Sequence, residues 1–488
     1  MKRFCYLLIG IIIILSLVGQ GVLSAKVYQA NGIKIGEVTS STAIIWTRLT
    51  KFLERNVDGI PFPTVPWQKV TTDDGKETYL YQKPQIPQRY TFDQMQDVVL
   101  GAAGEIRIAY WPKKRPQDKV FSPWTKVNPN HDFTHQFQLT GLGAGTRYQL
   151  ESQCRSDSIL GQTISGNFTT APEPSVSALV TFTVVTGQGF HRRDDPDNGH
   201  RIYPVMQGLN PDFFVHTGDI VYYDKLAPVA LTTDLARLKW NRIYALPFQR
   251  DFHNHVASYF IKDDHDVWQN DCWPIKQNKR MGDFTFKQGQ QIFLEQVPMG
   301  MQTYRTMRWG KDLQIWLVEG RDFRSPNSIP DGPDKTIWGN QQKTWFKRTV
   351  IDSDATFRIL ISPTPVVGPD REKKNDNHAN EGFKHEGDEL RHFMGQQKNM
   401  VVICGDRHWQ YVSVDPITGL REYSCGPTSN QHAGGFKQEY QQPMHRYLNI
   451  CGGFLSATVE RVNEQPLLTI RHHSVTGEIL NQDQLTAE

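Results

Sequence analysis

The sequence predicts an α/β fold: an α/β sandwich preceded by a smaller all-β domain. From 27 to 172 the chain consists of short strand-like segments separated by polar turns, which is typical of an antiparallel β-sandwich. From 178 to 488, apolar runs of roughly five to eight residues alternate with amphipathic segments of helical length, which indicates α/β layers. The proline-rich stretch Ala171–Pro174 marks the boundary between the two domains.

The composition is that of a globular protein without a strong charge bias. Of the 488 residues, 38% are hydrophobic and 22% are charged, which is too much apolar material for a disordered chain. Lysine and arginine number 54 against 51 for aspartate and glutamate, so the net charge is only +3. The balance carries no nucleic-acid-binding signature, and any charged surface must be local.

The first 25 residues predict a secretory signal peptide. Lys2 and Arg3 precede an apolar run over 4–18, and small residues then lead to Ala25. The alternative, a membrane anchor, requires about 20 apolar residues, more than this run or any later stretch contains. We therefore expect a periplasmic or secreted protein that has no membrane anchor after cleavage.

Five cysteines follow the predicted cleavage site. Because the number is odd, at least one thiol is expected to stay free or to pair between chains. Their spacing matches no structural zinc site. The five are Cys154, Cys272, Cys404, Cys425 and Cys451.

The all-β domain is expected to resemble a fibronectin type III module. Strand-like segments include 42–47 and 106–111. The segments 135–150 and 167–170 resemble the closing strands of that module. A proline-containing insert over 50–100 interrupts the domain and is expected to be a surface excursion.

Polar residues follow five apolar runs of the α/β domain. In an open α/β sheet, ligands bind beyond the carboxyl ends of the strands, so these polar groups can converge on one site. The five polar segments are Thr186–Gln188, Gly218–Asp219, Asp263–His265, Glu319–Arg321 and Gly405–His408.

Three of these segments carry carboxylates that suit a metal centre. Asp219, Asp264 and Asp406 are accompanied in the sequence by Tyr222 and His408. Carboxylates held close together raise one another's pKa, so their burial is unfavourable unless cations neutralise them. An oxygen-rich set with one imidazole suits calcium, magnesium, manganese, zinc or iron more than copper. Two such ions can bridge a hydroxide and clamp a phosphoryl group.

Three motifs occur in order along the chain: GDIVY at 218–222, DDHD at 263–266 and GDRH at 405–408. Together they resemble the alkaline phosphatase D (PhoD-like) family of calcineurin-like metallophosphoesterases, over nearly the whole mature chain. Short acidic motifs are individually weak, but the ordered set is specific. The similarity extends to the segment Trp338–Gln342. The resemblance implies a metallophosphoesterase α/β sandwich with a fibronectin-like N-terminal domain.

The resemblance also implies a set of metal ligands. Asp219 would bridge two ions, and Tyr222 and His408 would bind the first ion, which is ferric iron (Fe3+) in the family. Asp264 and Asp406 would bind the second ion, often calcium (Ca2+).

Further roles are implied for the catalytic and substrate-contacting residues. His265 would lie near the leaving-group oxygen as a general acid or hydrogen-bond donor, and Asp266 would hold its ring. Arg321 would contact the phosphate; the alternative for Arg321 is an ordinary salt bridge. Asn270 and His378 are further candidates for substrate contact.

One position departs from the family pattern. Relatives usually have a cysteine at the end of the first strand, whose thiolate binds iron, and this chain has Gly187 there. Gln188 beside it can supply an amide oxygen or a hydrogen bond, and we expect it among the substrate contacts. Without the thiolate, Mg, Mn or Zn can replace iron or calcium.

The function implied is hydrolysis of phosphate monoesters or diesters by an exported alkaline phosphatase or phosphodiesterase, through a metal-bridging hydroxide. One alternative is a surface binding or scaffold protein whose phosphatase domain has decayed. Another is a hydrolase of a related ester, such as a sulfate or a phospholipid head group. The sequence leaves the natural substrate, the metal pair and the oligomeric state open.

Overall fold

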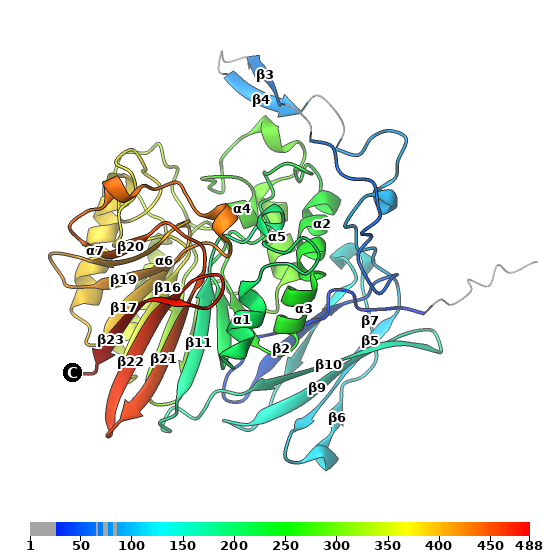
Figure 1. Cartoon of the computed structure of the whole chain (residues 1–488), viewed down its shortest axis with the longest axis horizontal. Coiled ribbons are helices and arrows are strands. Elements are labelled where there is room, and N and C mark those ends of the chain that lie inside the picture. Colours follow the sequence, from blue (N-terminus) through cyan, green and yellow to red (C-terminus); the bar gives the residue numbers. More distant parts are fainter. Residues whose placement is uncertain (1–25, 65–66, 72–76, 82–84) are drawn as a thin grey trace, which may run out of the picture.

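The computed structural model describes residues 26–64, 67–71, 77–81 and 85–488. Two large β-sheets form its centre, helices cover their outer faces, and an all-β part lies at one end (Figure 1). The predicted signal peptide, 1–25, lies outside the described residues. Within the ranges given above, no helix combines the length and apolar character needed to cross a membrane.

The larger sheet runs through both halves of the chain, in the order β23-β22-β21-β11-β12-β13-β1-β2-β8. Its central strands β11, β12 and β13 are parallel, as expected for strands connected through helices. The bounds are β1 Ile33–Gly36, β2 Ala43–Arg48, β8 Thr134–Leu139, β11 Val180–Val185, β12 Phe213–His216, β13 Ala257–Phe260, β21 Phe454–Val462, β22 Gln465–His473 and β23 Ile479–Thr486.

The second central sheet has the order β14-β15-β16-β17-β19-β18-β20. Here β15, β16, β17 and β19 are parallel, and antiparallel strands flank them. The bounds are β14 Arg305–Trp309, β15 Leu313–Leu317, β16 Phe357–Ser362, β17 Met400–Cys404, β18 Gln410–Val414, β19 Arg421–Cys425 and β20 His445–Asn449.

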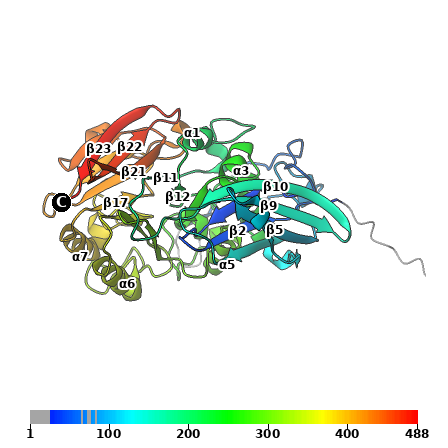
Figure 2. The ribbon, with the colours of Figure 1, turned by 90° about the horizontal axis from the view of Figure 1, so that it is seen from below.

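The N-terminal part is a β-sandwich that shares a sheet with the α/β part. Strand β1 pairs in parallel with β13, with Gly36 opposite Ser258, so the larger sheet continues into β1-β2-β8. The second layer has the order β10-β9-β5-β6, with β7 also paired to β5. Figure 2 shows this layer beside the helix-covered sheets. The bounds are β5 Glu105–Pro112, β6 Val120–Phe121, β7 Thr125–Lys126, β9 Arg147–Ser156 and β10 Ile159–Thr169.

The proline-rich stretch Ala171–Pro174 therefore separates two sequence patterns but not two sheets. The predicted insert contains a hairpin of β3 (Trp67–Thr71) and β4 (Glu77–Tyr81). Its base is closed by the Lys51 N–H, which donates to the Leu100 carbonyl over 2.8 Å. The two ends of the insert therefore lie side by side at the sandwich.

Helices cover the outer face of each central sheet because their apolar sides pack on strand residues that point outward. Helices α1 and α3, and α2 and α5, cover the larger sheet, and α6 and α7 cover the second. The α-helices are α1 Ile202–Gly208, α2 Thr233–Tyr244, α3 Pro247–His253, α4 Asp264–Val267, α5 Phe286–Gln296, α6 Gly339–Ile351 and α7 Lys384–Gly395. The 3-10 helices are η1 Phe92–Gln94, η2 Pro116–Asp118, η3 Pro129–His131, η4 Phe190–Arg192, η5 Lys279–Met281, η6 Glu381–Phe383, η7 Asn430–His432 and η8 Gln438–Tyr440.

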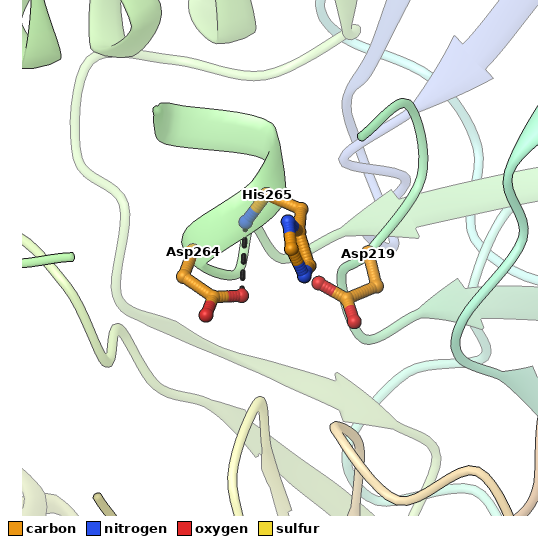
Figure 3. A group of neighbouring side chains, drawn as sticks. All are labelled: Asp219, Asp264 and His265. Atoms are coloured by element: carbon orange, nitrogen blue, oxygen red, sulfur yellow. Dashed lines mark hydrogen bonds between the residues drawn. The ribbon is translucent and has the colours of Figure 1, made fainter. Parts of the chain in front are cut away.

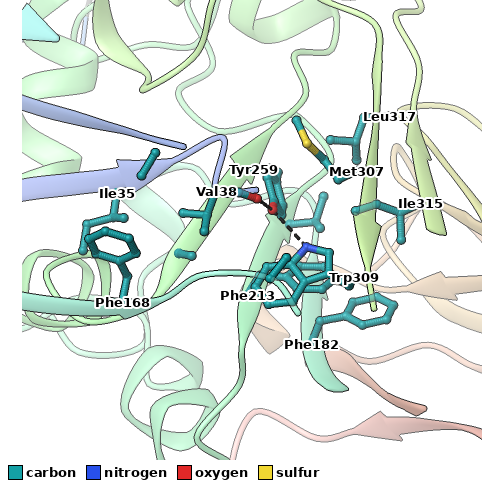
Figure 4. Close-up of a cluster of buried hydrophobic side chains, with 14 of the residues drawn as sticks. Ile35, Val38, Phe168, Phe182, Phe213, Tyr259, Met307, Trp309, Ile315 and Leu317 are labelled. Carbon is teal, nitrogen blue, oxygen red and sulfur yellow. Dashed lines mark hydrogen bonds between the residues drawn. The ribbon is translucent and has the colours of Figure 1, made fainter. Parts of the chain in front are cut away.

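One hydrophobic core joins the inner faces of both central sheets and the sandwich (Figure 4). Phe213 of the larger sheet packs against Trp309 of the second, with ring centroids 4.8 Å apart. The Tyr259 hydroxyl accepts a hydrogen bond from Trp309 Nε1 over 3.0 Å and donates to the carbonyl of Val38 in the N-terminal part over 2.5 Å. Phe168 of the sandwich belongs to the same cluster. This shared core fixes the sheets relative to one another.

The parallel strands of both central sheets lead at their carboxyl ends into loops that contact one another: the Asp406 N–H, after β17, donates to Thr186 Oγ1, after β11, over 3.2 Å. The predicted α/β sandwich with an N-terminal β-rich part is confirmed. All five predicted mature cysteines are free thiols in the described structure, so no disulfide joins these parts.

Candidate metal centre

The loops after β12 and β13 are packed so closely that one position requires glycine. Gly218 has a φ of +112°, and a Cβ there would lie 2.6 Å from Asp263 Cβ. Asp219, Tyr222 and Asp406 adopt left-handed backbone conformations, with φ values of 59°, 55° and 63°. Such conformations are costly for non-glycine residues and are concentrated at functional sites, where the surrounding fold enforces them. The fold thus holds Asp219, Tyr222 and Asp406 in strained backbone conformations.

Asp219, Asp264 and His265 bring three ligand-capable atoms within 4.8 Å of one another (Figure 3). All three side chains are buried. Asp219 Oδ1 has no hydrogen-bond partner although it is shielded from solvent. A buried anionic oxygen without a donor is unfavourable, so a cation at this point would satisfy it.

The predicted first-metal ligands come together beside Asp219. The Tyr222 hydroxyl lies 3.0 Å from Asp219 Oδ2 and 3.1 Å from His408 Nε2. His408 Nε2 lies 3.6 Å from the same carboxylate oxygen. Burial and the neighbouring Asp219 raise the pKa of Tyr222 well above its ordinary value. A Tyr222 phenolate would therefore require a metal ion to stabilise it.

The predicted second-metal ligands, Asp264 and Asp406, belong to a wider carboxylate group that includes Asp263. Burial raises the pKa of Asp406, assisted by Asp376 and Asp264 against the neighbouring Arg407. The pKa of Asp263 is also raised well above its ordinary value, chiefly by burial. The charges of Asp264, Asp219 and Asp406 add to this effect. Such mutual repulsion is relieved by bound cations, so the donor set fits hard metal ions.

His265 is oriented by Asp224, not by Asp266. Asp224 Oδ1 lies 2.7 Å from His265 Nδ1, so the Nδ1 proton is held and Nε2 faces the carboxylates. Burial lowers the pKa of His265, but Asp224, Asp264 and Asp219 outweigh burial and raise this pKa to about 10. Burial raises the pKa of Asp224, but the His265 charge and hydrogen bond outweigh it and hold this pKa at about 2.

The prediction that Asp266 holds the His265 ring is wrong. Asp266 Oδ1 accepts from the N–H groups of Ile220 and Val221 over 2.7 and 3.0 Å. Its other oxygen accepts from the Asp263 N–H over 3.2 Å. Asp266 lies in the first turn of α4 and turns toward free backbone donors, as acidic residues do at helix starts. It ties the loop after β12 to the loop after β13.

Arg321 forms salt bridges with carboxylates, which is the alternative that the sequence left open beside a phosphate contact. Its Nε donates to Asp263 Oδ1 over 2.5 Å, and its Nη2 lies 3.8 Å from Asp264 Oδ2. The side chain is only 1% exposed. Arg321 therefore supplies positive charge behind the carboxylate group.

Two of the predicted substrate contacts are turned into the protein. The Oε1 atom of Gln188 accepts from the Tyr203 hydroxyl over 2.9 Å and faces His216 Nε2 over 3.0 Å. His378 is fully buried and pairs with Glu386 over 2.9 Å. Both side chains are thus buried and bonded within the protein, which does not support the predicted substrate contacts of Gln188 and His378. Asn270 stays exposed beside the site, and its N–H donates to Asp224 over 3.2 Å.

Gly187 lies against the predicted first-metal ligands. A Cβ at Gly187 would come 3.1 Å from His408 Nε2, so a cysteine side chain there would project toward His408. The ring of His432 fills the neighbouring space, with its centroid 4.1 Å from that of His408. His432 Nδ1 lies 2.8 Å from the Gly187 carbonyl, to which it donates.

Two residues of the site, Asp224 and His432, are not among the residues predicted from the sequence. Asp224 follows the GDIVY motif by two residues, so its acidic character and proximity were the available signal. For His432 the sequence offered only a polar loop over 429–435.

Comparisons with known proteins identify a family and similar folds. A family model described as PhoD-like phosphatase matches residues 182–450. A solved structure described as PhoD has a TM-score of 0.67 and 16% identity, covering 94% of this chain and 88% of the other. Purple acid phosphatase PPD1 from seeds of yellow lupin (Lupinus luteus) has a TM-score of 0.61 and 12% identity, covering 93% of this chain and 74% of the other. No curated protein sequence matches the chain.

Proposed function

Because this chain belongs to the PhoD-like phosphatase family, we propose that it is an exported, metal-dependent phosphoesterase that hydrolyses phosphate monoesters, diesters or both. Membership supports a phosphoesterase, and the fold is that of phosphatases. Export rests on the signal-peptide pattern of the first 25 residues and would place the protein in the periplasm or outside the cell.

The observation that carries metal dependence is the unpartnered, buried Oδ1 of Asp219 within ligand distance of Asp264 and His265. Asp219 would lie between two ions, one held by Tyr222 and His408 and the other by Asp264 and Asp406. When bound, such ions activate water and neutralise the charge of the phosphoryl group. The ions are Fe3+ and Ca2+ by family resemblance; Mg, Mn or Zn also suit the ligand set because Gly187 provides no thiolate.

His265 is the proton donor in this proposal. Asp224 holds Nδ1, which leaves Nε2 on the side of Asp219 and Asp264, where the ester would bind. A proton delivered from Nε2 to the leaving-group oxygen would prevent an unfavourable alkoxide from forming. Arg321 and Asp263 would act as positioning residues, because Arg321 reaches the site only through carboxylates.

Asp219→Asn tests the proposal. Removing the negative charge is expected to lower hydrolysis of an aryl phosphate by about 100-fold or more and to lower bound metal by elemental analysis. Circular dichroism and thermal unfolding would report whether the fold survives. Asp157→Asn, an exposed change in the turn between β9 and β10, is the matched control and is expected to keep both activity and metal. An Asp219→Asn protein with unchanged rate and metal content would refute the assignment.

The same measurements separate the alternatives. Folded wild-type protein with almost no bound metal and no turnover would favour a scaffold with a decayed site, for which the missing thiolate at Gly187 is the only support. Parallel rates on an aryl phosphate, a bis-aryl phosphate, an aryl sulfate and a phospholipid would assign the ester class.

A further inference from the structure

A cavity of about 450 Å³ lies directly beside the metal centre. Tyr222, Asp224 and His432 form the wall that it shares with the centre. The Tyr222 ring is 4.4 Å from the His265 ring, and Asp224 bonds His265 Nδ1. The cavity therefore borders the proposed proton donor through Tyr222 and Asp224. Because Nε2 itself faces Asp219 and Asp264, the leaving-group oxygen would lie there, and the far end of a large leaving group could extend into the cavity.

The cavity is lined by five lysine and arginine side chains and by one carboxylate. That carboxylate, Asp224, is already engaged with His265. The cationic residues lie on η4, on the loop after β12, on α2 and on η5: Arg192, Lys225, Lys239, Arg242 and Arg280. An anionic group entering the cavity would meet favourable charge on several sides.

Two of these cations are buried without an acidic partner. Lys239 is 1% exposed, and its Nζ donates to the carbonyls of Tyr222 and Lys225 over 2.6 and 3.0 Å. Arg242 is 2% exposed, donates to the Ala227 carbonyl over 2.9 Å, and has an Nε without a partner. Neither forms an ion pair with any residue that the structure describes. Burial lowers the pKa of Lys239 well below its ordinary value and that of Arg242 to about 9.

Buried cations are unfavourable unless a negative charge approaches them. A bound anion would supply that charge, and the cavity would then bind it more strongly than a surface site of equal charge would. The two other cations with no ion pair among the described residues, Arg192 and Lys225, are exposed and would meet the anion as it enters.

The remaining wall is apolar. Phe190, Val221, Leu226 and Ala227 contribute to it, and the Arg242 guanidinium lies 4.3 Å from the centre of the Phe190 ring. A volume of this size fits an organic group of several carbon atoms rather than a lone ion, since ligand pockets have volumes of about 300–1,000 Å³.

We propose that this cavity binds the leaving group of the ester and selects leaving groups that carry their own negative charge, a carboxylate or a second phosphate, on an apolar frame. This inference rests on the proposed phosphoesterase activity. It assigns the substrate class as phosphate esters of anionic organic alcohols.

Three phenyl phosphates test the inference, because a methylene spacer keeps their leaving groups similar in reactivity. They carry para carboxymethyl, phosphonomethyl or neutral carbamoylmethyl groups, and released phosphate gives kcat/KM. The wild type is expected to prefer the anionic esters by about tenfold, the effect of one well-placed charge pair. Comparison of kcat/KM between the carboxymethyl and phosphonomethyl esters shows which anion the cavity binds better.

The variants are Arg192→Gln and Lys225→Gln, separately and together. Both residues are exposed, so the fold is expected to survive. The double variant is expected to reduce the preference without abolishing it, because the buried Lys239 and Arg242 remain, whereas Arg115→Gln, on the distant η2 of the sandwich, keeps the wild-type ratio. Equal rates for the three esters in the wild type, or a preference unchanged in the double variant, would overturn the inference and leave the phosphoesterase proposal intact. No hydrolysis of any ester by metal-loaded wild type would overturn both.

Discussion

Asp224→Asn is the change that most directly tests how His265 works. The side chains of Asp224 and His265 are 5% and 7% exposed, and a 2.7 Å contact joins Asp224 Oδ1 to His265 Nδ1. Asparagine keeps an oxygen that can accept from Nδ1 but removes the charge. Among the described residues, the second oxygen of Asp224 accepts from the Asn270 N–H alone, over 3.2 Å, so the structural cost is small.

The expected decrease in kcat of Asp224→Asn follows from the burial of the Asp224–His265 pair. Removing one member of a buried, hydrogen-bonded charge pair costs about 2–5 kcal/mol. We take the lower part of that range because Asp264 and Asp219 still raise the pKa of His265 in the variant. About 2.7 kcal/mol corresponds to about a 100-fold decrease in kcat when the leaving group needs a proton.

The assay compares leaving groups of different basicity. With an alkyl phosphate the full decrease is expected, whereas 4-nitrophenolate leaves without a proton and its rate is expected to fall by less than about tenfold. Asp266→Asn is the matched control: it removes a charge that contacts backbone N–H groups instead of His265. It is expected to lower thermal stability without a dependence on the leaving group. Equal losses for both substrates in Asp224→Asn, or a leaving-group effect in Asp266→Asn, would refute the reasoning.

Three further predictions follow. Burial lowers the pKa of His472 from 6.5 to about 4, so below pH 6.5 the unfolded chain binds a proton that the folded chain does not, and folding stability falls as the pH drops toward 4. The loss is about 3 kcal/mol. In His472→Gln the urea unfolding midpoint is expected to fall less steeply with decreasing pH than in the wild type; an equally steep fall would contradict this prediction. Gly218→Ala is expected to destabilise the fold by more than about 1 kcal/mol and to reduce bound metal, because its Cβ would meet Asp263; a wild-type melting temperature would argue against this packing. Gly187→Cys is expected to increase the iron retained on purification, because a thiolate there would face His408; elemental analysis showing unchanged iron would reject that geometry.

The ordered motifs were sufficient to predict the fold class and the meeting of the principal carboxylates. Asp219, Asp264 and Asp406 each follow a buried strand, and the carboxyl ends of parallel strands share one edge of a sheet. Tyr222 and His408 were predicted with them, and the structure brings both beside Asp219. These groups were predictable because strand direction is encoded locally, in the apolar runs and the turns that follow them.

Other features depend on which direction a side chain takes within a loop. Asp266 is adjacent to His265 in the sequence, yet the helical turn of α4 directs it to backbone N–H groups. Asp224 is 41 residues away and reaches the His265 ring. Gln188 likewise follows β11 as predicted, but its amide turns inward to buried Tyr203.

By itself, the sequence determined the order of strands and acidic motifs, and therefore that charge would gather at one sheet edge. Only the tertiary structure decided that β1 extends the central sheet through β13, that Asp224 orients His265, and that Lys239 and Arg242, which form no ion pair with a described residue, line the adjacent cavity. The physical reason is that strand periodicity acts over a few residues, whereas hydrogen bonding and burial depend on which distant segments the folded core brings into contact.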